Sequence, residues 1–380
     1  MIAKNTNNKM GANIALKPDV IQWAIQRSGL PEEKIYKKFP KLKNGLPSLT
    51  LKQLKDFANY VRAPFVDLLL GIIPPDAELP IPDFRTQGDK PIQKPSQNLL
   101  DIIWIMRKRQ EWMRDYLLSQ QAQTLSFIGS LRNIKNPMNA AVKIREILGI
   151  ETDWKRNAPQ LNYPLKYFRE KMEDIGVMVF LESGLNSKQQ FDPEEFRGFV
   201  LNDNIAPFLF VNAADSKTAQ LFTIVHEFVH LCKGDGGLID MDNEKTTESF
   251  CNQTAAEILL PKKLFISLWN QSPENINSIA KYYGVSSLVV ARRAKDCLLI
   301  TEDEYWDFYN NQVNTNYNQK KSGGGDFYNN KRYQLSSNFS YSVVIAEKYG
   351  QITFREAFSL LGLSSATFDK FSNYITGGIR

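Results

Sequence analysis

The chain alternates between two hydrophobic periods, and the helical period dominates. Near the start, Val20, Ile21, Ala24 and Ile25 recur at the spacing of one helical face. The same spacing continues along most of the sequence, with Pro, Gly, Ser or Thr at the ends of the runs. It predicts helices or helix pairs over residues 18–30, 31–39, 48–62, 98–121, 139–148, 217–232, 246–259, 279–297 and 353–375.

The period changes between residues 176 and 214. Three short apolar runs, 176–182, 197–203 and 206–214, are bounded by Gly, Asn, Asp or Pro and predict the strands of a small sheet. A predicted helix, 217–232, follows at once. The expected fold is therefore α+β and mostly helical, with a small β-sheet packed on helix 217–232 and helical domains on both sides.

Three stretches lack either period. Residues 72–95 contain six prolines and predict an extended linker. The Gly- and Asp-rich stretch 234–244 predicts a loop, and so does the Asn-, Gln- and Lys-rich stretch 311–340. The domain boundaries that we predict are 1–75 for a helix-turn-helix domain, 76–155 for a linker and helical segment, 156–300 for a catalytic domain, and 301–380 for a helical extension.

Composition places the chain among ordinary globular proteins, with 43% apolar and 23% charged residues. No apolar run approaches the roughly 20 residues that span a bilayer, so we expect no membrane partner. The polar start lacks the apolar segment of a signal peptide. Three cysteines without framework spacing are typical of reduced thiols. We therefore expect a cytoplasmic protein.

The net charge of +6 is concentrated at one end of the chain. Residues 1–62 hold twelve Lys or Arg against four Asp or Glu, and their three short predicted helices suggest a helix-turn-helix module. The segment 39–48 is short for a recognition helix and contains two prolines and a glycine. We therefore expect DNA contacts to be made to phosphates rather than base edges. The candidate phosphate-binding residues are Lys37, Lys38, Lys41 and Lys43.

The chemistry is carried by the only two histidines, His226 and His230, which lie four positions apart in the run HEFVH. Four residues make just over one helical turn, so both imidazoles project from one face and can bind one Zn²⁺ ion. Glu227 is rotated by about 100° from His226 and is placed to act as a general base. Apolar flanking residues indicate a buried helix. Two alternatives stay open: a purely structural zinc, and a degenerate site without activity.

A zinc site of this kind needs a third protein ligand, and without a third histidine it must be a carboxylate. Glu248 is favoured because it opens a predicted helix that can pack on the first. Asn252, one turn later, is expected to hydrogen-bond one of the histidines. Glu257 is rotated about 180° from Glu248 and should face away. The other downstream candidates are Asp235, Asp240, Asp242 and Glu244.

At these residues the sequence resembles the ImmA/IrrE family of bacterial metallopeptidases. The resemblance rests on FTIVHEFVHL (222–231) and ESFCNQTAAEILLP (248–261), preceded by RGF (197–199) and PFLFVN (207–212). It covers about residues 160–300 and implies a minimal zincin in which Glu248 is the third zinc ligand. The N-terminal part resembles an XRE-type helix-turn-helix, and the tail looks like the C-terminal extension of long family members.

The resemblance implies regulated proteolysis. We expect a zinc-dependent endopeptidase that cleaves one regulatory protein, such as a repressor or an antitoxin in a stress, mobile-element or toxin–antitoxin system. The alternative is an antitoxin or transcriptional regulator that binds DNA and a partner toxin, with a vestigial or structural zinc site. A histidine that stabilises the oxyanion is excluded because no third histidine exists. A tyrosine or an arginine is left for that role.

Overall fold

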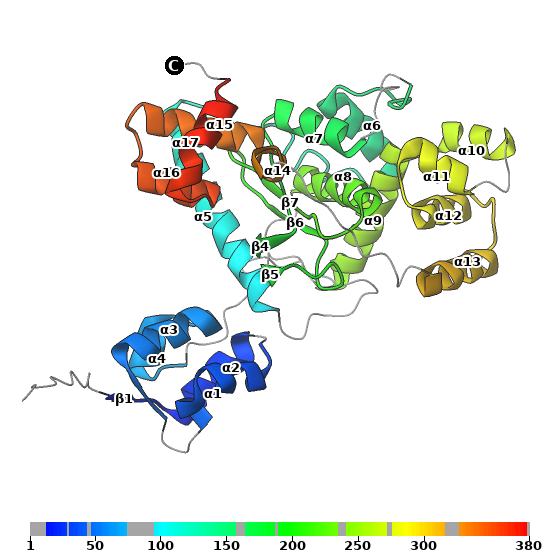
Figure 1. Cartoon of the computed structure of the whole chain (residues 1–380). Coiled ribbons are helices and arrows are strands. Elements are labelled where there is room, and N and C mark those ends of the chain that lie inside the picture. The colour runs from blue at the N-terminus through cyan, green and yellow to red at the C-terminus, as the bar shows by residue number, and fades with distance from the viewer. Residues whose placement is uncertain are drawn as a thin grey trace, which may run out of the picture. The chain divides into compact units, whose positions relative to one another are not determined.

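The computed structural model describes residues 13–28, 30–43, 47–73, 95–156, 164–186, 189–234, 241–271, 276–315 and 327–377. The chain divides into two compact units (Figure 1). The first comprises residues 1–80 and 93–103, and the second comprises residues 81–92 and 104–380. The division falls within one long helix, α5 (Gln97–Ser119).

The N-terminal unit is a small helical body closed by a two-stranded sheet. Strands β1 (Asn13–Ala15) and β2 (Ser48–Thr50) pair antiparallel. Thr50 caps the next helix in a capping box with Gln53, because each side chain accepts a hydrogen bond from the other's backbone N–H. A four-residue 3-10 helix follows the second helix, within the segment 39–48. The helices are α1 (Pro18–Ser28), α2 (Glu32–Lys38), η1 (Pro40–Lys43), α3 (Leu51–Val61) and α4 (Phe65–Leu70).

The second unit is mostly helical, with one sheet of three strands in its core. Strand β7 (Phe208–Asn212) lies between β3 (Met178–Glu182), to which it is parallel, and β6 (Gly198–Leu201), to which it is antiparallel. A short hairpin of β4 (Gly184–Asn186) and β5 (Gln189–Gln190) follows β3. The three core strands lie within the three predicted runs, and the α+β, mostly helical fold class is confirmed.

Helices surround this sheet (Figure 1). Helix α8 packs on β6 and β7, α7 packs on α8 and β3, and α9 packs on α8 and α6. No helix among the described residues is long and apolar enough to cross a membrane. The helices of this unit after α5 are α6 (Pro137–Leu148), α7 (Pro164–Asp174), α8 (Lys217–Lys233), α9 (Met241–Leu259), α10 (Lys262–Gln271), α11 (Ile276–Tyr283), α12 (Ser287–Asp296), α13 (Glu302–Thr315), α14 (Phe327–Gln334), α15 (Ser337–Lys348), α16 (Phe354–Leu361) and α17 (Ser365–Ile375).

Two loop predictions are wrong in part. Helix α9 begins at Met241, inside the stretch 234–244 that was expected to be a loop. The predicted loop 311–340 contains the end of α13, all of α14 and the start of α15. Weak helix propensity there is overridden by tertiary contacts, since Leu335 is fully buried. Most of the predicted Pro-rich linker, residues 74–94, lies outside the described residues, as do residues 235–240 and 316–326.

Candidate metal centre

The two histidines lie on helix α8, and most residues of this helix are buried. Ser216 caps its first turn through a hydrogen bond from the backbone N–H of Ala219, and Gly234 ends it in the left-handed conformation. The backbone N–H groups of Gly129 and Leu131 donate to the carbonyls of Leu231 and Cys232, at 3.3 and 2.9 Å. The last turn, which holds His230, is therefore fixed by a segment about a hundred residues earlier in the chain.

The ring nitrogens of the two histidines meet the carboxylate of Glu248. The Nε2 atoms of His226 and His230 are 3.0 Å apart. The Nε2 atom of His226 lies 3.4 Å from Glu248 Oε2, and that of His230 lies 3.1 Å from Glu248 Oε1. One candidate ligand atom from each of these residues lies within 4.8 Å of the others. The structure thus brings together the three side chains that the sequence nominated.

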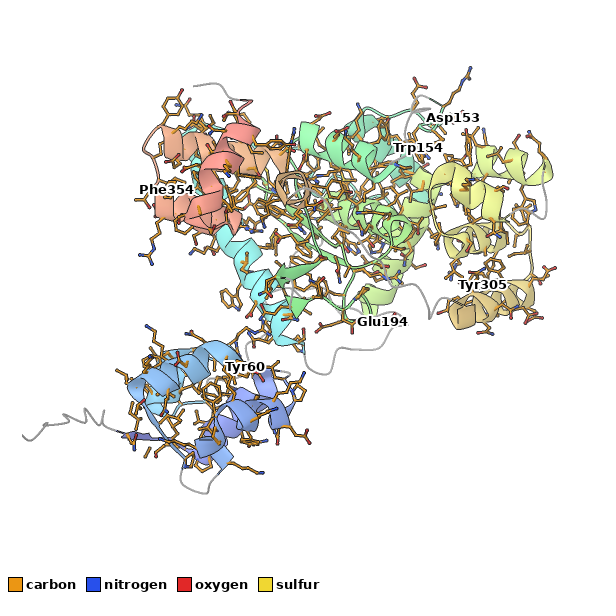
Figure 2. The ribbon with its side chains drawn as sticks, in the orientation of Figure 1. Tyr60, Asp153, Trp154, Glu194, Tyr305 and Phe354 are labelled. Carbon is orange, nitrogen blue, oxygen red and sulfur yellow. The ribbon has the colours of Figure 1, made fainter. Side chains whose placement is uncertain are left out.

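Helix α9 holds Glu248 in this position because its far end is anchored. Arg145 donates a 2.5 Å hydrogen bond to the carbonyl of Glu257, and Trp154 donates a 3.2 Å bond to that of Leu259. Arg293 donates a 3.0 Å bond to the carbonyl of Leu260 and forms an ion pair with the buried carboxylate of Glu257. Glu257 therefore faces away from the histidines, as its rotation predicted. Trp154 is marked in Figure 2.

Glu227 lies on the side of α8 that faces strand β6. A Cβ atom added to Gly198 would come within 3.0 Å of Glu227 Cγ and 2.7 Å of Thr223 Cγ2, so only glycine fits there without a shift. Burial raises the pKa of Glu227, and the nearby Glu248 raises it further, against the opposing effect of the two histidines. The carboxylate of Glu227 is therefore not part of the ligand cluster, although its charge interacts with all three residues of that cluster.

The sequence interpretation missed Cys251 and misplaced Asn252. Burial alone would lower the pKa of His230, but Cys251, Glu248 and Glu227 outweigh it and raise that pKa well above its usual range. Cys251 contributes through a side-chain hydrogen bond to His230. Asn252 is exposed, and no hydrogen bond within the described part of the chain joins it to either histidine. The side chain on α9 that contacts His230 is therefore that of Cys251, one position before the expected Asn252.

The carboxylate of Glu248 carries the opposite shift. Burial would raise its pKa, yet hydrogen bonds and charge interactions with His226 and His230 hold that pKa well below its usual range. The carboxylate is therefore ionised, which is the form that binds a metal. Of the other predicted residues, Lys37, Lys38, Lys41 and Lys43 are exposed on α2 and η1 in the N-terminal unit. Asp235 and Asp240 lie outside the described residues.

The donor set fits a zinc ion. Two imidazole nitrogens and one carboxylate oxygen are a common three-ligand set for zinc, and they leave a fourth position open. The buried thiol of Cys251 is not among the clustered ligand atoms, so it does not close that position. The buried Nδ1 atom of His226 has no hydrogen-bond partner within the described residues.

Comparison with known families supports this interpretation. Residues 172–295 match the family model of the IrrE N-terminal-like domain, Peptidase M78. Residues 335–374 match that of a domain of unknown function (DUF8813). No curated protein matched the chain. The first match spans β3 to α12, including both histidines and Glu248, and supports a zinc-dependent peptidase domain of the ImmA/IrrE type over these residues.

Proposed function

We propose that this chain is a zinc-dependent endopeptidase that cleaves one specific regulatory protein. The observation that carries the proposal is the convergence of His226 Nε2, His230 Nε2 and the Glu248 carboxylate beside the separate carboxylate of Glu227. A purely structural zinc usually has four protein ligands. The three ligand atoms here leave room for a reacting group.

The three converging residues would hold the ion, and Glu227 would move the proton. When bound, zinc supplies a Lewis acid that lowers the pKa of water and polarises a carbonyl. Glu227 then accepts a proton from the attacking water and passes it to the leaving amine. Its position beside Gly198 fixes the side chain on the β6 side of the site.

Strand β6 offers a surface for the substrate backbone. It is an edge strand of the described three-stranded sheet. The backbone N–H of Asn212 donates to the carbonyl of Arg197 at 2.7 Å, so by the strand period Gly198 and Val200 turn their backbone groups away from β7. An extended peptide can add to such an edge through main-chain hydrogen bonds. This supports a protein substrate that is bound in extended form near Glu227.

We propose a regulatory protein, such as a repressor or an antitoxin, as the substrate, because the matched domain is of the ImmA/IrrE type and further segments of the chain flank it. The matched domain covers residues 172–295, and structured segments lie on both sides of it. Contacts far from the metal can position one bond for attack, which makes cleavage selective. We therefore propose that general protein substrates are poorly cleaved.

Purified chain and candidate substrates test the proposal directly. The chain is incubated with each protein encoded beside its gene and, separately, with casein, with and without a chelator. We expect chelator-sensitive cleavage of one neighbouring protein at a single site, and slow loss of casein. The Glu227→Gln variant is the matched control for contaminating proteases. Rapid digestion of casein by the intact chain contradicts the proposed selectivity.

The exposed lysines of the N-terminal unit support a second, accompanying role. Lys37, Lys38, Lys41 and Lys43 are exposed within seven positions of α2 and η1, where they can contact phosphates. The four-residue η1 offers little length for base contacts in a groove. We propose that this unit binds nucleic acid weakly and without sequence preference. A regulator that binds DNA and a partner toxin remains the alternative function, and the cleavage assay above distinguishes it.

A further inference from the structure

The three-stranded sheet has two apolar faces, and different parts of the chain cover them. Side chains alternate along a strand, so neighbouring residues of β3 and β7 point to opposite faces. Val179, Leu181, Leu209 and Val211 belong to the core that contains α8. Phe180 and Phe208 alternate with them and are also buried, with ring centroids 5.0 Å apart. These two rings need a partner on the face opposite α8.

Phe339 of α15 is that partner. Its ring centroid lies 5.5 Å from Phe180 and 5.9 Å from Phe208. Trp112 of α5 meets the same ring edge-on at 5.8 Å. Phe339 is fully buried. The part of the second face formed by Phe180 and Phe208 is therefore covered from the segment 335–374, which matches a domain of unknown function.

Hydrogen bonds fix the start of this segment to α7. The carboxylate of Glu173 accepts a 3.1 Å bond from the backbone N–H of Ser337, and its carbonyl accepts a 2.7 Å bond from Asn338 Nδ2. Arg169, one turn earlier, donates to the carbonyls of Tyr333 and Leu335. Both Arg169 and Glu173 are buried. Helix α7 itself packs on α8, so the same helix contacts the metal-site helix and the C-terminal segment.

A buried charged pair links the end of β3 to the middle of the segment. Arg109 of α5 donates from Nη1 to Glu182 Oε1 at 2.7 Å and from Nε to the carbonyl of Leu360 at 2.8 Å. Lys331 lies 3.9 Å from the second oxygen of Glu182. Arg109 and Glu182 are only 4% and 7% exposed. Burying such charges is costly unless they are paired, so α16 completes a network that β3 cannot satisfy alone.

We propose that residues 335–374 are an integral structural part of the peptidase unit and fold together with the sheet and α8 in one cooperative transition. The segment is then a permanent intramolecular partner of the sheet, and not an appended module with a stability of its own. The proposal rests on packing, hydrogen bonds and a buried ion pair outside the metal centre, so it holds whether or not that centre is catalytic.

Native-state hydrogen exchange of the full chain in increasing urea tests this proposal. The perturbing variant is Phe368→Ala, because Phe368 is buried within the segment and its ring packs on Phe354, which is marked in Figure 2. We expect the protection of β3, α8, α15 and α17 to fall together, by roughly tenfold or more. Helix α3 of the N-terminal unit serves as an internal control and should keep its protection.

The matched surface variant is Tyr349→Ala, since Tyr349 is 78% exposed and should change no protection. If Phe368→Ala does not accumulate as folded protein, Phe368→Leu should give a smaller loss with the same distribution. Wild-type protection of β3 and α8 alongside loosened α15 and α17 overturns the proposal. That outcome leaves the zinc chemistry untouched, because it concerns folding only.

Discussion

Gly198 and Glu227 lie so close together that a side chain on Gly198 would crowd the side chain of Glu227. A methyl group on Gly198 would lie 3.0 Å from Glu227 Cγ and 2.8 Å from the carbonyl oxygen of Phe210 in β7. Strand β6 can therefore lie directly against the face of α8 that carries the proposed general base.

Gly198→Ala should force β6 and α8 apart. We expect a loss of about 1–3 kcal/mol in the free energy of unfolding, as for other overpacked sites, together with reduced cleavage. Urea unfolding and the peptidase assay measure the two effects. Thr223→Ser removes the methyl group that lies 2.7 Å from the added Cβ, so the double variant should recover part of the stability. An unchanged midpoint for Gly198→Ala contradicts the packing argument.

The metal content of the purified chain should be about one Zn²⁺ ion. His226→Ala removes one of the three converging ligand atoms and should bring the content close to zero. Because the ion binds only the folded state, free zinc at 1,000 times its Kd stabilises the fold by about 4 kcal/mol. Elemental analysis and thermal unfolding with a chelator check both points. Equal zinc content in the unaltered chain and in His226→Ala would contradict the ligand assignment.

Glu227→Gln should separate proton transfer from metal binding. The amide keeps the size of the side chain but cannot accept the proton, so cleavage should fall by about 10²–10⁴-fold. Zinc content and the urea midpoint should stay close to those of the unaltered chain, because Glu227 lies outside the ligand cluster. Loss of zinc in this variant shows that the roles of Glu227 and Glu248 are wrongly assigned.

Glu182 should make the fold sensitive to acid. Burial would raise its pKa, but Arg109 and Lys331 outweigh it and lower the pKa below that of the unfolded chain. Its stabilising effect is therefore complete above the unfolded pKa of about 4.3, and is lost as pH falls through the folded pKa.

The test for this group is Glu182→Gln. It should cost about 3–5 kcal/mol at pH 7, because Arg109 keeps a buried charge without its partner. The variant should also lose stability less steeply below pH 4 than the unaltered chain. Urea midpoints from pH 3 to pH 7 give both quantities. Parallel curves for the two proteins contradict the assignment.

Nucleic-acid binding by the N-terminal unit should depend on salt more than on sequence. If Lys37, Lys38, Lys41 and Lys43 each contact one phosphate, the log of the binding constant falls with log salt at a slope of about −3 to −4. Replacing one lysine by Gln should reduce that slope by about one. Titration against two unrelated duplexes at several salt concentrations measures it. A tight complex with one sequence that resists salt overturns the prediction.

The spacing of His226, Glu227 and His230 predicted their arrangement because a single helix fixes it. Glu248 was chosen because it opens a helix that can pack on the first, and the rotation along that helix then excluded Glu257. It was harder to predict whether Cys251 or Asn252 contacts His230, since residues three and four positions after Glu248 both lie near the same helix face as Glu248. Which of them turns toward His230 depends on how α9 crosses α8, and that crossing is set by α6 and the anchors at Arg145, Trp154 and Arg293.

The predicted loop 311–340 failed for a related reason. Its Asn-, Gln- and Lys-rich composition has weak helix propensity, and local pattern is all that a sequence interpretation can use. The carbonyls of Tyr333 and Leu335 are held by Arg169, which is more than 160 positions away. Contacts over such separations decide whether a weak segment becomes a helix, and no window of neighbouring residues contains them.

Because backbone groups cap the end of α8, substitutions in the capping stretch and changes in its length will affect the site unequally. Gly129 and Leu131 support the last turn of α8 through main-chain N–H groups, which every residue except proline possesses. Exchanging side chains along this stretch one at a time would leave those donors in place, except at Gly129, whose φ of +74° strains any residue other than glycine. Inserting or deleting a single residue there would shift the donors out of step with Leu231 and Cys232. The turn that carries His230 is thus protected against most point substitutions and vulnerable to a change in chain length.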